Sequence, residues 1–162
     1  MRYAVKQKIF SFGDSFTIRD EYGQDCYRVR GKVFSFGNKL RIYDMQENEL
    51  VYIEQKVFRF LPEYHIYYLG QLYAVVKKEF SFFRPKFQIQ GTNAQYRVEG
   101  NIWAMDFNIL REGRQIAQVS KRWFSWSDTY GVDIIGEEDP VFILALVIVL
   151  DQVLHDNKHN NS

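Results

Sequence analysis

The sequence predicts a mainly β fold, in which a closed antiparallel barrel of about twelve strands wraps around one hydrophobic C-terminal helix. Three observations support this prediction: a short aromatic motif recurs along the chain, an alternating apolar pair and a turn follow the copies, and an apolar run at Pro140–Leu154 breaks the pattern. Alternation with a period of two residues is typical of half-buried strands. Self-similarity at a regular interval indicates a repeated structural unit.

The repeated motif starts at a basic residue in five of its six copies and continues with two bulky residues separated by one position. The first two copies are nearly identical, since Lys8–Gly13 has the sequence KIFSFG and Lys32–Gly37 has KVFSFG. Successive leading aromatic residues lie 21 to 24 positions apart along the chain. The other copies are Lys56–Phe60, Lys78–Phe82, the weaker Asn101–Met105, and Arg122–Trp126.

Each repeat predicts one long strand that contains the motif and one short strand that follows it. Turn-forming residues such as Glu21–Gln24 and Glu112–Gly113 separate a short strand from the next long one. The hairpin-length connections predict that neighbouring strands pair antiparallel. The expected strands are residues 3–12, 15–20, 25–36, 39–45, 50–60, 64–69, 72–82, 86–91, 95–104, 106–111, 115–126 and 129–135.

The long strands carry apolar residues on both faces. In the strand expected at 25–36, Val29 and Val33 share one face, whereas Phe34 and Phe36 share the other. A β-bulge near Gly31, and one near Gln55 in the next copy, would bring both sets to the core, and we expect such a bulge or an equivalent bend. In the alternative arrangement without a bulge, the aromatic pairs face outward beside a basic residue.

The segment from Pro140 to Leu150 contains no charged or polar side chain, and Asp139 in front of it suits a helix N-cap. A helix that is apolar on all sides must be buried on all sides. A membrane span needs about 20 apolar residues, whereas a run of roughly 10–14 is more typical of a buried core helix. Because Asp151 and Gln152 end the apolar run, a core helix is predicted rather than a membrane span.

The predicted barrel has room for one helix. Twelve strands spaced about 4.8 Å apart and tilted by roughly 40° give a diameter of about 24 Å. Inward side chains leave a lumen of roughly 10–14 Å, which is close to the helix width of about 10–12 Å. The helix therefore fills the lumen, and this disfavours a carrier of small apolar ligands.

Length and composition suit one domain of 162 residues with a sizeable core. We expect the barrel and its helix to form a single domain at residues 1–156, followed by a flexible polar tail at 157–162. Cys26 is the only cysteine, so no disulfide framework and no cysteine metal site are expected. The first residues lack an apolar segment of signal-peptide length, which predicts a cytoplasmic protein.

The sequence contains no catalytic motif, so we do not expect an enzyme. It lacks the glycine-rich phosphate-binding loops and the GxSxG nucleophile motif. His155 and His159 have a helical metal-ligand spacing but lie near a polar terminus without an HExxH context, and no metal or other cofactor is expected. The net charge of +1 disfavours a nucleic-acid partner.

The repeats and the C-terminal helix resemble the LURP-one-related family, in particular its small bacterial members. The resemblance covers nearly the whole chain and depends on the KxFSFG-type copies, on RWFSWSDTYGVDI at Arg122–Ile134 and on the helix DPVFILALVIVLDQVLHD. It implies a twelve-stranded barrel around a central helix, related to tubby C-terminal domains and phospholipid scramblases, and it implies no defined activity. No motif here matches the tubby phosphoinositide site or the scramblase calcium segment, so no residue role is transferred.

The remaining functional signal is a basic position that recurs in five of the six repeats. Basic residues interleaved with aromatic ones suit an anionic membrane surface, where each cation contributes about 1 kcal/mol. We therefore expect a non-enzymatic binding module for anionic phospholipid surfaces, peripheral at the membrane. The alternative is a structural or protein-interaction scaffold with no lipid role, in which the basic residues only keep the strand ends soluble. The candidate lipid-binding residues are Lys8, Lys32, Lys56, Lys78 and Arg122.

Overall fold

The structure, a computed structural model, describes residues 1–6, 15–34, 37–57, 59–124 and 128–159, with the backbone alone at 32–34 and 155–159. Twelve strands and one helix lie in these ranges, which confirms the predicted fold class. The elements are β1 (Arg2–Lys6), β2 (Ser15–Asp20), β3 (Asp25–Phe34), β4 (Gly37–Asp44), β5 (Glu49–Gln55), β6 (Glu63–Tyr68), β7 (Gln71–Glu79), β8 (Lys86–Gly91), β9 (Gln95–Asn101), β10 (Asp106–Arg111), β11 (Arg114–Ser120), β12 (Thr129–Ile134) and α1 (Pro140–His159).

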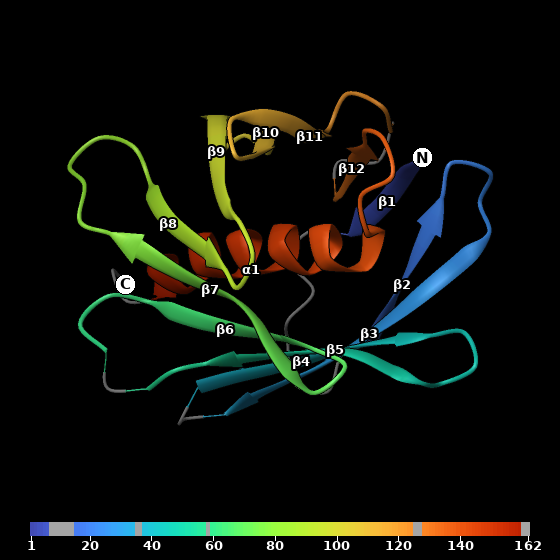
Figure 1. The fold of residues 1–162 in the computed structure, drawn as a ribbon, viewed down its shortest axis with the longest axis horizontal. Coiled ribbons are helices and arrows are strands. Elements are labelled where there is room, and N and C mark those ends of the chain that lie inside the picture. Colours follow the sequence, from blue (N-terminus) through green and yellow to red (C-terminus); the bar gives the residue numbers. More distant parts are fainter. Residues whose placement is uncertain (7–14, 35–36, 58, 125–127, 160–162) are drawn as a thin grey trace.

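Every strand pairs antiparallel with its neighbours in the sequence, and β1 pairs with β12 to close the barrel. In such an up-and-down barrel, all connections from an odd to an even strand emerge at one end. We call this the motif end, because each copy of the repeated motif overlaps one of these connections in the sequence. The opposite end, which carries the even-to-odd turns and the connection to α1, is the turn end. Figure 1 shows the β7–β8 connection on the left, near the C-terminal part of α1, and the β2–β3 turn on the right.

Helix α1 runs through the barrel interior and contacts β5, β6 and β12 (Figure 1). Its residues from Val141 to Leu154 are all buried, which confirms the prediction of a core helix. The Val141 amide donates a hydrogen bond of 3.0 Å to Asp139 Oδ1, so Asp139 is the predicted N-cap. In the part of the chain that the structure describes, no helix is long and apolar enough to cross a membrane.

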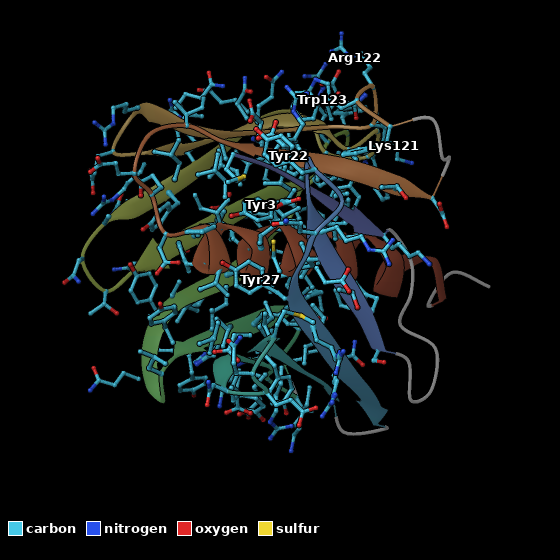
Figure 2. All side chains as sticks on the ribbon, turned by 90° about the vertical axis from the view of Figure 1, so that its right-hand side faces the viewer. Tyr3, Tyr22, Tyr27, Lys121, Arg122 and Trp123 are labelled. Atoms are coloured by element: carbon cyan, nitrogen blue, oxygen red, sulfur yellow. The ribbon has the colours of Figure 1, made fainter. Side chains whose placement is uncertain are left out.

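The turn end of the lumen is closed by aromatic side chains. The Phe142 ring lies 4.6 Å from the Tyr73 ring and 5.2 Å from the Tyr96 ring. Tyr68 packs against Tyr73 at 5.7 Å, and a hydrogen bond links Tyr68 to Asp139. Tyr3 and Tyr27 form a further pair, with ring centroids 6.1 Å apart, and are labelled beside α1 in Figure 2. We call Tyr3, Tyr27, Tyr68, Tyr73 and Tyr96 the tyrosine cap.

The expected bulges near Gly31 and Gln55 are not found. The β3–β4 register continues without a shift across Gly31, and β5 ends at Gln55. The register shifts lie instead at the turn end, where one residue near the start of an odd strand has no partner in the preceding even strand. Each unpaired residue packs in or against the core. A bulge changes the direction of the side chain at the extra residue, which allows this packing. These residues are Cys26, Leu50, Tyr73 and Ile116.

The odd strands also end earlier than predicted. β5 stops at Gln55 instead of residue 60, and β7 stops at Glu79 instead of residue 82. The even strands are short. The last residues of an odd strand therefore extend past the start of the following even strand and have no residue there to pair with. Phe60 of the third motif copy and the aromatic residues of the fourth copy therefore lie in connections at the motif end. The first copy lies outside the described residues, and so do Phe58 of the third copy and the ends of the second and sixth copies.

Candidate functional site

The β7–β8 connection presents three phenylalanines to solvent. Phe80, Phe82 and Phe83 expose 67%, 83% and 95% of their surface. The Ser81 hydroxyl donates a hydrogen bond to the Arg84 carbonyl, which closes a tight turn with Phe82 and Phe83 at its tip. The Phe80 and Phe82 rings meet edge to face at 5.0 Å. A loop that orders aromatic rings toward water is characteristic of an interaction surface.

The neighbouring β5–β6 connection adds a fourth exposed ring, since Phe60 is 96% exposed. The end of this connection is held to β7, because the Lys78 amide donates to the Pro62 carbonyl at 3.0 Å. We call Phe60, Phe80, Phe82 and Phe83 the aromatic tip. Trp103 in the β9–β10 connection is 48% exposed at the same end of the barrel.

Basic side chains flank the aromatic tip. Arg84 and Lys86 are exposed, and no carboxylate of the described residues forms an ion pair with either. Arg59 and Lys77 lie 3.7 Å and 3.9 Å from Glu63. The pKa of Glu63 is lowered, first by its 2.8 Å hydrogen bond with His65 and then by these two cations. The region therefore combines exposed aromatic surface with an excess of positive charge.

The predicted basic residues lie at the motif end but at different points around the barrel. Lys56 follows β5, and its ammonium lies 3.2 Å from Glu54, a hydrogen bond that raises the pKa of Lys56. Arg122 follows β11, halfway round the barrel from β5, and lies 3.2 Å from Asp106. Figure 2 shows Arg122 beside Lys121 and Trp123 at the outer surface.

The other predicted positions differ in their surroundings. Lys78 lies near the end of β7, where its side chain is half-buried, and desolvation lowers its pKa. Lys32 lies on β3 with only its backbone described, and Lys8 lies outside the described residues. The structure thus places the described candidates in a band around the motif end, of which only Lys78 and Lys56 lie next to the aromatic tip.

The sixth motif copy has a structural role. The Trp123 ring covers Gly131 of β12, where an added Cβ would lie 2.5 Å from it. The Arg2 guanidinium packs over the same ring at 4.1 Å from its centroid. Phe124, which occupies the repeated aromatic position, is also only partly exposed and lies against Gly131, so this position contributes to packing here and to an exposed surface in the fourth copy.

Sequence reasoning missed Phe83, which lies outside the repeated motif. The signal was present, since the fourth copy is the one followed by another phenylalanine and by Arg84-Pro85-Lys86. The fourth copy adds aromatic and basic residues that the other copies lack. This difference indicates that the fourth copy does more than form a pair of strands.

Charge is distributed unequally along the barrel axis. At the turn end, residues 20–25, 44–49 and 137–139 each contain three acidic residues and no basic one. At the motif end, residues 77–86 contain four basic residues and one acidic one. Among the described residues, no group of three or more His, Cys, Asp or Glu side chains is arranged to hold a metal ion. The electrostatic feature is therefore a basic motif end opposite an acidic turn end.

Comparison with known proteins identifies the family. The sequence profile of the LURP-one-related family matches residues 1–151, which contain all twelve strands and most of α1. The chain belongs to the LURP-one-related family. A relative from Bacillus subtilis (strain 168), the uncharacterized protein YxjI, is 40% identical over 155 residues, which cover 95% of this chain and 94% of YxjI.

A solved structure of a protein from Arabidopsis thaliana has the same fold as this LURP-one-related chain. The two superpose with a TM-score of 0.67 over 94% of this chain and 91% of the plant protein. Their sequences are 18% identical, so the likeness extends to the fold alone.

Proposed function

We propose that the protein is a non-enzymatic module that binds anionic phospholipid surfaces peripherally through the aromatic tip and the basic residues around it. The observation that carries the proposal is the β7–β8 connection, where exposed Phe80, Phe82 and Phe83 precede Arg84 and Lys86. Aromatic rings enter the headgroup region of a bilayer, while cations beside them attract anionic lipids.

The charge distribution of the barrel supports one orientation on the membrane. An anionic surface attracts the basic motif end and repels the acidic turn end, so the molecule approaches with the aromatic tip first. Each exposed cation near the headgroups contributes about 1 kcal/mol, and each fully buried phenylalanine about 1.5–3 kcal/mol. Contributions of this size support reversible attachment.

Flotation with vesicles tests the proposal directly. The protein is expected to float with vesicles of phosphatidylcholine and phosphatidylglycerol, and to stay behind with phosphatidylcholine alone. Binding should weaken when salt is raised to about 1 M, where the Debye length falls to about 3 Å. An absence of flotation with the anionic vesicles at low salt, or equal flotation with both kinds, contradicts the proposal.

Variants at the motif end and control variants elsewhere identify the part of the surface that contacts the membrane. Phe82→Ser with Phe83→Ser should weaken binding at least about tenfold, because it removes most of the apolar surface of the tip. Tyr22→Ser removes an aromatic ring that is 79% exposed at the turn end, and it should leave binding unchanged. Arg84→Glu with Lys86→Glu should weaken binding more than Lys56→Glu with Arg122→Glu, because Lys56 and Arg122 are already paired with Glu54 and Asp106.

A further inference from the structure

The outer wall of β3 to β6 carries a row of side chains that are direct neighbours in the strand register. Arg30 lies opposite Arg41, Arg41 lies opposite Tyr52, and Tyr52 lies opposite Tyr67. We call these four residues the tyrosine–arginine row. On the far side of Tyr67, Leu72 of β7 continues the row and is 44% exposed.

The two flat faces of the Tyr52 ring are already covered within the row. The Arg41 guanidinium lies 4.6 Å from the centroid of the Tyr52 ring. On its other side, Tyr52 stacks on Tyr67 with centroids 5.8 Å apart and planes 30° from parallel. The Tyr52 hydroxyl is also hydrogen-bonded to Glu54. The Tyr52 ring therefore stands on the barrel wall with its edge toward solvent.

A groove of about 460 Å³ lies beside these rings. Tyr52 and Tyr67 form one wall, while Leu50 and the exposed Leu69 supply aliphatic surface. Arg41 also lines the groove, with its Nε 2.7 Å from a carboxylate oxygen of Glu49. The groove thus offers aromatic edges, apolar side chains and an arginine that is partly neutralised.

This geometry selects among the ligands that bind exposed aromatic residues. Nucleobases bind by stacking on free ring faces, which Arg41 and Tyr67 occupy on Tyr52. An added β-strand needs an open sheet edge, whereas β4, β5 and β6 each pair on both sides. A polyproline II segment suits the groove, because its proline rings pack between aromatic and aliphatic side chains and its backbone carbonyls need external donors.

The arginines indicate an acidic residue in the ligand. Arg30 and Arg41 face each other directly, and like charges in this position destabilise a sheet. Glu47 compensates both Arg28 and Arg30, at 3.6 Å and 3.4 Å, while Glu49 compensates Arg41. Three arginines therefore share two carboxylates. Although the β4–β5 turn is acidic, its Glu47 and Glu49 are both paired with these arginines. An acidic side chain beside Arg30 and Arg41 would complete the neutralisation.

We propose that the tyrosine–arginine row and its groove bind a proline-rich, acidic segment of a partner protein in the polyproline II conformation. From β3 to β6 the row spans three inter-strand distances, or roughly 14 Å, which matches about five residues at about 3.1 Å per residue. The groove lies near the β4–β5 and β6–β7 turns, away from the aromatic tip. A partner could therefore bind while the motif end rests on a membrane, and the proposal does not depend on lipid binding.

The test uses the full chain without lipid and a fluorescein-labelled peptide of sequence Pro-Pro-Glu-Pro-Pro-Glu-Pro-Pro, followed by fluorescence anisotropy. Saturable binding is expected. A peptide in which every proline is replaced by glycine has the same charge but no preformed polyproline II helix, so it should bind at least about tenfold more weakly. No binding of the proline peptide, or equal binding of both peptides, would overturn the proposal.

Variants of exposed residues keep this test independent of folding. Tyr67→Phe removes a donor to the peptide carbonyls and should weaken binding about fivefold. Leu69→Ser removes aliphatic surface at a 64% exposed position and should also weaken binding, whereas Tyr22→Phe, which lies outside the groove, should not. Peptide affinity that is unchanged by Tyr67→Phe and Leu69→Ser, in variants that melt like the parent, contradicts the assigned site. Displacement of the peptide by an oligothymidine would assign the groove to nucleic acid instead.

Discussion

Gly131, beneath the Trp123 and Phe124 rings, shows how one residue determines whether a repeated aromatic position is buried or exposed. A Cβ at position 131 would lie 2.5 Å from the Trp123 ring and 2.9 Å from the Phe124 ring. The absence of a side chain at Gly131 therefore allows the indole to lie on β12 beneath Arg2. In the fourth copy, Phe80 corresponds to Phe124, and both Phe80 and Phe82 are exposed.

Gly131→Ala should destabilise the protein by about 1–3 kcal/mol, because the methyl group forces the indole off the barrel wall. Chemical denaturation followed by circular dichroism measures this change. Adding Trp123→Leu should recover part of the loss, since the smaller side chain leaves space for the methyl group. If the single variant is as stable as the parent, or if the two substitutions are simply additive, the packing described for Trp123 is wrong.

At the scale of the elements, the sequence was sufficient to predict the strands and the helix. The alternation of apolar residues located all twelve strands, and the apolar run with Asp139 in front located α1. The ends of the odd strands could not be predicted, because KVFRF at 56–60 has the same alternation as the strand before it. The residue at which an odd strand ends depends on the length of its partner strand. The alternation within the odd strand does not contain this information.

The bulges were expected at the wrong end of the odd strands for a related reason. The sequence pattern shows apolar residues on both faces of the long strand, although only one face can point into the core. A bulge at Gly31 would bring both sets to the core. In the structure, Phe60 of the third copy and the phenylalanines of the fourth copy are exposed, and the bulges pack apolar residues such as Leu50 and Tyr73 against the core at the turn end. The exposure of Phe60 or Phe83 therefore had to be read from the structure.

The tyrosine cap makes the stability of the protein sensitive to alkaline pH. Desolvation by burial, followed by interactions with Asp139, raises the pKa of Tyr68 to about 12. Desolvation and the neighbouring Tyr73 raise the pKa of Tyr96 to about 12. Tyrosines of the unfolded chain ionise near pH 10, at about their ordinary pKa. Folding therefore favours the protonated phenols, and this contribution is fully present below about pH 10 and decreases as the pH rises toward about 12.

The free energy of unfolding should fall between about pH 10 and pH 12, by up to about 1.4 kcal/mol per pH unit for each such tyrosine. Urea titrations at several pH values measure it, and tyrosine absorbance reports the ionisation. Tyr96→Phe should reduce the pH dependence, whereas Tyr22→Phe at an exposed position should not. A stability that stays constant across this range would show that the cap is open to solvent.

At the scale of the whole molecule, the barrel depends on its central helix. α1 is buried from Val141 to Leu154 against inward residues such as Ile53 and Ile66. Without it, a barrel of this size encloses an apolar lumen about one helix wide, and an empty cavity of that size is not compatible with a packed core.

Deletion of Val141–Leu154 should therefore give a chain that does not fold cooperatively. Thermal melting followed by circular dichroism checks this, with a chain ending at Asp156 as the control, which should melt like the parent. A soluble deletion variant with a cooperative transition would show that the strands close without the helix.

The molecule as a whole separates its core from its surface functions. The hydrophobicity of α1 is used inside the barrel, so any membrane contact must come from the outer surface, where the basic motif end carries the aromatic tip. The candidate site could be predicted in part, since the sequence indicated a basic and aromatic interface on an anionic membrane. It did not show which repeat presents its rings, because that depends on the turn at Ser81–Arg84 and on its neighbour at Pro62.

The depth of a spin label at position 82 tests this orientation most directly. Phe82→Cys and, separately, Tyr22→Cys, each combined with Cys26→Ser, place one label at the motif end and one at the turn end. On vesicles that contain phosphatidylglycerol, the label at position 82 should become accessible to oxygen and protected from a water-soluble relaxation agent, while the label at position 22 should remain in water. A label at position 82 that stays in water on bound protein, or a label at position 22 that enters the bilayer, would contradict the proposed orientation.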